Sequence, residues 1–274
     1  MTVLIIGASG FLGMELVRQA RAAGRATAAT FHSRPGGASG TSWHQLDLRD
    51  ASRLDAVLDA VAPTAVINAA SGEANWAVTA DGPLRLAVAT ASRGIRLVHV
   101  SSDAIFSGAD VHYDETALPD PVTPYGAAKA TAETAVRLLH PCAVVARTSL
   151  IIGDRGSAHE RIVHELAVGT REGALFTDDV RCPVHVTDLA AALWELASSD
   201  ATGVFHLAGP DAVSRHALGV LVARRDGLDP ALLPAGRRTD STLPGALDVR
   251  LDSRATQRRL STRLRGVREF LGKG

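Results

Sequence analysis

The chain of 274 residues lacks a net charge, because 29 lysines and arginines balance 29 aspartates and glutamates. A chain without net charge has no general attraction for nucleic acid or for an anionic membrane surface. No apolar run approaches the ~20 residues that a membrane-spanning helix needs. No basic region followed by an apolar core, typical of a secretory signal, opens the sequence. We therefore expect a protein that binds neither nucleic acid nor membranes.

Cysteine is scarce as well. Cys142 and Cys182 are the only two, and their wide separation predicts neither a disulfide framework nor a zinc site. His159 and His164 stand five residues apart, so on a helix they would point to different faces and could not share a metal ion. We expect no metal and a reducing, cytoplasmic location.

The most informative segment is residues 2–13, where an apolar run of strand type leads into three glycines spaced three apart. Gly7 can take a sharp turn, Gly10 lets the backbone approach a pyrophosphate, and Gly13 lets the following helix pack closely on the strand. The usual dinucleotide pattern has glycines at one, three and six, so the match is not literal. A plain glycine-rich turn is the alternative. The predicted cofactor contacts here are Gly7, Ser9, Gly10, Phe11 and Leu12.

The end of the second expected strand, residues 25–31, lacks an acidic residue. An acid there would bond the adenosine ribose hydroxyls and select NAD. Ser33 and Arg34 follow instead and could hold a 2′-phosphate, which makes NADPH the preferred cofactor and leaves NADH as a second option. The alternative for Arg34 is a solvated loop arginine.

Two further strand ends are candidates for cofactor contacts. Residues 43–48 end in Asp47 and Leu48, which could bracket an adenine ring, although an aspartate here could instead cap the helix expected over 51–61. Residues 64–70 end in Ala69 and Ala70, whose small side chains would let a cofactor pass close by.

Strands and helices alternate along the first two thirds of the chain, with further strands expected at 95–100, 142–147 and 203–207. This alternation predicts an α/β fold with a doubly wound parallel sheet of the Rossmann type. We expect a dinucleotide-binding domain over 1–152, with a strand return near 187–208. Residues 153–186 and 209–274 would form a small C-terminal substrate-binding lobe. The leucine-containing basic tail, 254–268, predicts a solvated amphipathic helix.

Ser102, Tyr125 and Lys129 form the candidate catalytic group. Tyr125 and Lys129 are four apart at the start of a helix, so they share one face. A free tyrosine has a pKa of ~10, and a nearby lysine ammonium favours the phenolate. A serine hydroxyl at the preceding strand end could bond the same substrate oxygen. Lys129 could also reach the nicotinamide ribose, so Tyr125 and Lys129 are predicted cofactor contacts as well. Together the three residues could protonate a carbonyl oxygen as hydride reaches its carbon.

These residues resemble those of a known family, the extended short-chain dehydrogenase/reductases. The resemblance lies in residues 7–13 (GASGFLG), 68–70 (NAA), 101–103 (SSD) and 125–129 (YGAAK). The chain looks most similar to the dTDP-4-dehydrorhamnose reductase branch, through residues 100–106 (VSSDAIF), 113–115 (YDE), 147–149 (RTS) and Pro183 before 188–190 (DLA).

The resemblance implies an NADPH-dependent reductase of a 4-keto sugar nucleotide. It assigns Ser102 as the catalytic hydroxyl, Tyr125 as proton donor, Lys129 as its partner, and Asp103 as a residue that helps to hold the sugar. Two segments depart from the branch, 71–76 and 178–183, and both lie where the substrate would be chosen. Independently of the resemblance, four arginines are candidates for binding a nucleotide diphosphate in the small lobe: Arg147, Arg155, Arg161 and Arg171. The alternative for each is a surface charge.

Two other functions stay open. An epimerase or dehydratase would retain and recycle bound NAD, and a regulatory subunit would bind NADP without turnover. A homodimer is also left open.

Overall fold

The computed structural model describes residues 2–38, 40–242 and 244–272. The chain forms two compact units, each assembled from three segments that are distant in sequence. The first unit contains Met1–Ser102, Pro124–Arg147 and Ala190–Phe205. The second contains Asp103–Thr123, Thr148–Leu189 and His206–Gly274.

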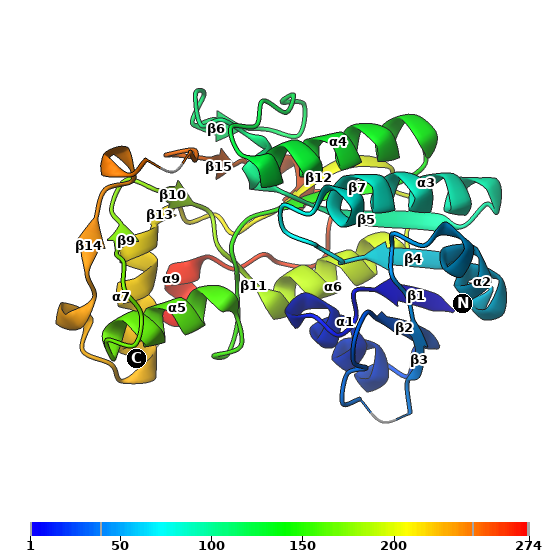
Figure 1. Cartoon of the computed structure of the whole chain (residues 1–274), viewed down its shortest axis with the longest axis horizontal. Coiled ribbons are helices and arrows are strands. Elements are labelled where there is room, and N and C mark those ends of the chain that lie inside the picture. The colour runs from blue at the N-terminus through cyan, green and yellow to red at the C-terminus, as the bar shows by residue number, and fades with distance from the viewer. Residues whose placement is uncertain (1, 39, 243, 273–274) are drawn as a thin grey trace. The chain divides into compact units, whose positions relative to one another are not determined.

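A seven-stranded sheet forms the centre of the first unit, in the order β12-β7-β5-β4-β1-β2-β3 (Figure 1). β1 pairs in parallel with both β2 and β4, β2 with β3, and β4 with β5. The predicted doubly wound sheet is therefore confirmed, including the strand near Phe205 that returns to it. The strands are β1 (Val3–Ile6), β2 (Thr27–Phe31), β3 (Ser42–Gln45), β4 (Ala65–Asn68), β5 (Arg96–Ser102), β7 (Val144–Thr148) and β12 (Gly203–Leu207).

Helices cover both faces of this sheet. Those of the first unit are α1 (Phe11–Ala22), α2 (Ala51–Val61), η1 (Ala77–Asp81), α3 (Gly82–Ser92), α4 (Pro124–Leu139) and α6 (Val186–Ala197). On one face Leu58 of α2, Leu86 of α3 and Val136 of α4 share a core cluster with strand residues. α1 and α6 lie side by side on the other face, where the Trp194 indole N–H donates to the Leu16 carbonyl (3.1 Å).

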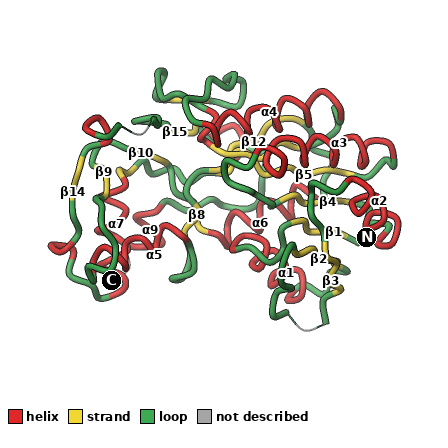
Figure 2. Tube along the Cα trace, in the orientation of Figure 1, coloured by secondary structure: helices red, strands yellow, loops and turns green. Residues whose placement is uncertain are grey.

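Short strands and loops make up most of the second unit (Figure 2). Its two-residue strands pair as β10-β13, β11-β8, β14-β9 and β15-β6. Apolar residues of α5, α7 and α9, among them Val163, Leu218 and Val267, form its core. The strands are β6 (His112–Tyr113), β8 (Ile151–Ile152), β9 (Leu175–Phe176), β10 (Val180–Arg181), β11 (Val184–His185), β13 (Val213–Ser214), β14 (Ala235–Gly236) and β15 (Arg250–Leu251). The helices are η2 (Asp103–Ile105), α5 (Ala158–Ala167), α7 (Arg215–Asp226), η3 (Pro230–Leu232), η4 (Arg238–Asp240), α8 (Arg254–Gln257) and α9 (Val267–Leu271).

The prediction of one amphipathic helix over 254–268 was wrong. Helix α8 ends at Gln257, and the chain then runs irregularly to α9. The Gln257 side chain donates to the Thr262 carbonyl (2.7 Å) and accepts from the Leu264 N–H (2.9 Å), which folds the chain into a loop. Arg265 then forms an ion pair with Asp188 (2.8 Å). These tertiary contacts outweigh the helical periodicity.

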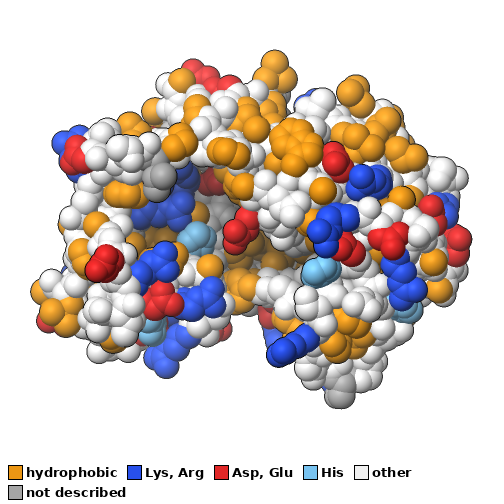
Figure 3. All heavy atoms as spheres, in the orientation of Figure 1, with side chains coloured by type: hydrophobic (Ala, Val, Ile, Leu, Met, Phe, Trp, Pro, Cys, Tyr) orange, Lys and Arg blue, Asp and Glu red, His pale blue; other side chains and the backbone are white. Residues whose placement is uncertain are grey.

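Neither unit carries a surface of one charge sign on the face drawn in Figure 3, where acidic and basic side chains are interspersed. Among the described residues, no helix combines the length and the apolarity needed to cross a membrane.

A buried ion pair fixes α4 to the sheet. Glu133 and Arg147 are both fully buried, and the Arg147 Nε atom donates to the Glu133 carboxylate (3.1 Å). The Ser101 hydroxyl donates to the same carboxylate (3.1 Å). The prediction that Arg147 can contact a nucleotide diphosphate was therefore wrong, because its guanidinium is enclosed in the first unit and paired there.

We expect Glu133→Gln to lower the free energy of unfolding by about 3–5 kcal/mol, because it leaves a buried guanidinium without its counter-charge. Urea denaturation measures this. The matched control is Glu15→Gln, which breaks an exposed pair with Arg18 (2.6 Å) and should cost at most about 1 kcal/mol. Equal losses in the two variants would contradict the importance of the buried pair.

Candidate functional site

The glycine turn between β1 and α1 has the conformation that its sequence predicts. Gly7 has a φ of +77°, in the left-handed region, and its N–H donates to the Thr30 hydroxyl (3.1 Å). A Cβ added to Gly13 would lie 2.3 Å from the Gly7 carbonyl oxygen. No side chain caps the start of α1, where Gly10 is the capping residue. The N–H groups of the first turn are thus available to an anion.

A cavity of about 560 Å³ opens beside this turn, within the first unit. Eight of the predicted cofactor contacts line it: Gly7, Ser9, Gly10, Phe11, Asp47, Leu48, Ala69 and Ala70. Leu12, which is buried, does not line it. Ser33 and Arg34 are exposed and do not line it either.

Other residues of the cavity wall were not predicted from the sequence. They include Thr30, Phe31 and His32 at the end of β2, Leu46 and Arg49 beyond β3, and Ser71, Gly72, Asn75 and Val78 after β4. A signal for them existed, since the strands of a parallel sheet all end at one edge and ligands bind there. Residues that directly follow each strand are therefore candidates.

Asp47 contacts two basic side chains of this wall, Arg49 and His32. Its Oδ2 atom accepts from Arg49 Nη2 (2.6 Å) and lies 3.3 Å from His32 Nε2. The Arg49 Nε atom also donates to Oδ1 (3.0 Å), so the guanidinium forms hydrogen bonds with both carboxylate oxygens. These hydrogen bonds from Arg49 hold the pKa of Asp47 well below its usual range. The carboxylate is ionised at neutral pH.

A buried polar pair supports the loop after β4. The Asn68 amide lies opposite His99 in the β4–β5 pairing, with 3.1 Å between Nδ2 and the imidazole Nδ1. The Asn68 Oδ1 atom accepts from the Ala70 N–H (3.2 Å). Burial lowers the pKa of His99 to about 3, so the imidazole is neutral and can accept from the amide. The pair therefore restrains the Ala70 backbone at the cavity wall.

Ser102, Tyr125 and Lys129 are placed by β5 and the start of α4. Ser102 is the last residue of β5, and Tyr125 lies in the first turn of α4; both are half-buried. Lys129 is only 3% exposed and donates from Nζ to the Val100 carbonyl (3.1 Å). This bond fixes the helix start against the strand end. None of the three lines the 560 Å³ cavity, although β5 ends at the same sheet edge.

Asp103 belongs to the second unit and is buried. Its Oδ2 atom accepts from the Ser149 hydroxyl (2.6 Å) and lies 3.8 Å from Arg181 Nε. The departing segment 178–183 contributes Arg181 and the fully buried Asp179. Three arginines pair with Asp179: Arg181 (2.9 Å), Arg215 (3.4 Å) and Arg238 (2.9 Å).

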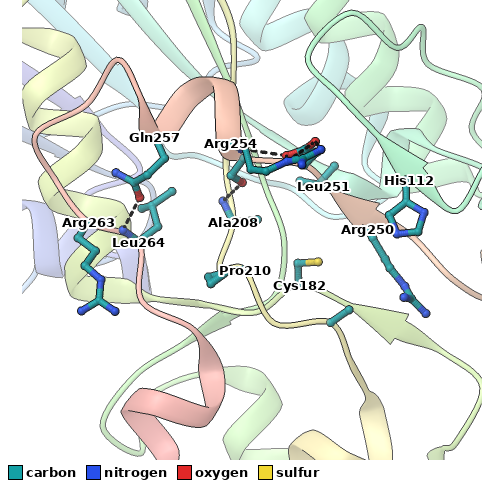
Figure 4. A pocket seen from close by; sticks show the side chains of 13 residues that line it. His112, Cys182, Ala208, Pro210, Arg250, Leu251, Arg254, Gln257, Arg263 and Leu264 are labelled. Atoms are coloured by element: carbon teal, nitrogen blue, oxygen red, sulfur yellow. Dashed lines mark hydrogen bonds and ion pairs between the residues drawn. The ribbon is translucent and has the colours of Figure 1, made fainter.

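A second cavity, of about 720 Å³, lies entirely in the second unit (Figure 4). Arg250 and His112 lie on one side of it and Arg263 on the other. Each of its arginines pairs with an acid, as Arg250–Asp248 (2.7 Å), Arg254–Asp252 (2.7 Å) and Arg263–Glu269 (2.7 Å). Burial raises the pKa of Cys182 to about 11, so its thiol stays protonated at neutral pH. This cavity therefore holds no thiolate.

A parallel doubly wound sheet with a glycine turn at its carboxyl edge defines the class of nucleotide-binding α/β proteins. The family model described as the RmlD substrate binding domain matches residues 1–272. The chain belongs to this family, within the extended short-chain dehydrogenase/reductases.

Relatives agree with this assignment. The chain is 30% identical over 262 residues to a probable low-salt glycan biosynthesis reductase, Agl14, of Haloferax volcanii, covering 90% of this chain and 87% of the relative. It is 35% identical over 240 residues to dTDP-4-dehydrorhamnose reductase of Mycobacterium tuberculosis, covering 83% and 76%. The fold is similar to that of dTDP-4-dehydrorhamnose reductase from Bacillus anthracis in complex with NADP, with a TM-score of 0.84, 21% identity, and coverage of 99% and 97%.

We expect Gly13→Ala to lower the free energy of unfolding by about 1–3 kcal/mol, because the added methyl group would collide with the backbone of Gly7 and Ala8. Gly37→Ala is the matched control, since nothing lies within 4 Å of its added Cβ. Thermal or urea unfolding compares them. An unchanged stability of Gly13→Ala would show that the turn does not need the close approach.

The buried ammonium predicts a pH dependence of stability. Burial lowers the pKa of Lys129 to about 8, whereas an unfolded lysine titrates near ~10.4. Between these values the unfolded chain binds more protons, so the free energy of unfolding rises with pH. Relative to Lys129→Met, the wild type should gain up to about 3 kcal/mol from pH ~8 to ~10.4. Urea titrations across this range test it, and a constant difference between the two proteins would refute the lowered pKa.

Proposed function

We propose that this protein is an NADPH-dependent reductase that converts the 4-keto group of a deoxysugar nucleotide into an alcohol. The observation that carries the proposal is the buried Lys129, one helical turn after Tyr125 and bonded to the strand that ends in Ser102. The relative from Mycobacterium tuberculosis, a dTDP-4-dehydrorhamnose reductase, supports the substrate class. The NADP bound to the Bacillus anthracis structure supports the cofactor.

The residues of the 560 Å³ cavity fit a dinucleotide. The N–H groups after Gly10 would hold the pyrophosphate. Gly7 and Gly10 have no side chains that would obstruct it, and at Gly7 an added Cβ would collide with Ala70. Asp47 and Leu48 would lie at the adenosine end. When bound, NADPH supplies the hydride for C4 of the sugar.

The chain's own groups manage the proton. The Tyr125 hydroxyl would donate its proton to the sugar oxygen as the carbonyl is reduced. The Lys129 ammonium would stabilise the resulting phenolate. The Ser102 hydroxyl would donate a hydrogen bond to the same oxygen and stabilise its developing negative charge.

The second unit offers groups for the nucleotide part of the substrate. Arg181, Arg215 and Arg238 surround Asp179, and with Asp103 included, three guanidinium groups face two carboxylates. A cluster with more positive than negative charge suits a diphosphate, since arginine binds phosphate oxygens through paired N–H groups. Asp103, held by Ser149, would accept a hydrogen bond from a sugar hydroxyl.

We expect the purified protein to oxidise NADPH when freshly prepared dTDP-4-dehydrorhamnose is added. Tyr125→Phe should lower kcat by about 10²–10⁴-fold, because it removes the proton donor. Tyr113→Phe is the matched control, since this tyrosine accepts hydrogen bonds from the Gly108 and Asp110 N–H groups in the second unit and should leave turnover intact.

Equal rates for wild type and Tyr125→Phe would contradict the assigned proton donor. Protein that purifies with bound NAD and consumes no NADPH would instead support an epimerase or dehydratase.

A further inference from the structure

The residues that follow β2 differ in whether they line the 560 Å³ cavity. Ser33 and Arg34, which the sequence suggests for a 2′-phosphate, are exposed and lie outside the cavity wall. His32 lies in that wall, and its imidazole Nδ1 is 3.0 Å from the Ser33 hydroxyl. The cavity therefore meets the end of β2 at His32.

Arg49, which carries a guanidinium, reaches the same part of the wall from beyond β3. His32 Nε2 and Arg49 Nη2 both approach one oxygen atom, Oδ2 of Asp47, at 3.3 and 2.6 Å. The two side chains thus converge although 17 positions separate them in the chain. Both remain accessible to a ligand, since their side chains are 65% and 52% exposed.

The Asp47 carboxylate is already engaged. The Arg49 guanidinium grips both of its oxygens, and the Arg49 backbone N–H donates to Oδ1 as well (2.9 Å). Ribose hydroxyls would have to compete with these charge-assisted bonds. An acid that selects NAD must be free to accept from those hydroxyls. Asp47 is therefore poorly suited to that role and well suited to orienting the Arg49 guanidinium and the His32 imidazole.

We propose that His32 and Arg49 form the anion site that distinguishes a 2′-phosphorylated dinucleotide from NADH. A guanidinium edge and an imidazole N–H supply donors to the phosphate oxygens. This inference rests on the proposed use of NADPH. His32 and Arg49 take the role in selecting NADPH that the sequence suggested for Ser33 and Arg34.

Calorimetric binding of NADPH and NADH, without any sugar, tests the inference. Arg49→Ala should weaken NADPH binding about tenfold or more and leave NADH binding nearly unchanged. Arg49→Lys keeps the positive charge but loses the paired N–H donors of the guanidinium. Its affinity for NADPH should lie between those of wild type and Arg49→Ala. His32→Ala should weaken NADPH binding about two- to tenfold. The matched control is Arg21→Ala, an exposed arginine in the last turn of α1 that does not line the cavity.

Binding of 2′,5′-ADP and of AMP gives the same comparison without the nicotinamide half. Wild type should prefer 2′,5′-ADP, and Arg49→Ala should lose that preference. Loss of the preference in Arg34→Ala but not in Arg49→Ala would overturn the inference in favour of the loop after β2. Equal wild-type affinities for NADPH and NADH would overturn it as well.

These outcomes are separable from a failure of the proposed function. A protein that binds NADPH selectively through Arg49 but reduces no sugar nucleotide would contradict the reductase alone. A protein that reduces the sugar equally well with NADH and NADPH would contradict the cofactor inference and the preference for NADPH, and would leave the proposed reduction of the sugar intact.

Discussion

Helix α4 presents two ionisable side chains to the interior of the first unit. Lys129 bonds to the Val100 carbonyl, and four residues later Glu133 bonds to Ser101 and Arg147. A buried charge that loses its partner costs several kcal/mol, so sliding α4 along β5 is strongly disfavoured. The proposed reduction depends on this restraint, because Tyr125 lies one helical turn before Lys129, and Ser102 lies two residues after Val100, the hydrogen-bond partner of Lys129.

The cavity of about 560 Å³ is formed by parallel strand pairing and close approach of the backbone. The strands β1, β2, β3 and β4 all run in one direction, so the residues that follow them meet at one edge. Glycine at position 7 is required twice, by its positive φ and by the 2.7 Å that would separate a Cβ from the Ala70 Cα atom. Asp47 then brings His32 and Arg49 together on this edge. Backbone geometry forms the proposed site for the pyrophosphate, and side chains form the proposed site for the 2′-phosphate.

The second unit is built differently. Its strands are two residues long, and its helices α5, α7 and α9 supply most of the core. Such short strand pairs contribute little by themselves, so ion pairs such as Arg265–Asp188 and the group around Asp179 help to define the loops. The segment 178–183, which departs from the related branch, provides Asp179 and Arg181.

The sequence by itself determined the sheet, most helices and the glycine turn, because these depend on periodicity and spacing along a short stretch of chain. It also singled out Ser102, Tyr125 and Lys129 as candidates, since the last two share a helix face at four-residue spacing. Only the tertiary structure decided that Arg49 rather than Arg34 faces the cavity, that Arg147 is enclosed by Glu133, and that the basic tail forms a loop. Those outcomes depend on partners 14 to 77 residues away, such as Glu133 for Arg147 and Asp188 for Arg265, or on which way an exposed side chain turns. Local patterns carry no information about such partners, because packing alone brings them into contact.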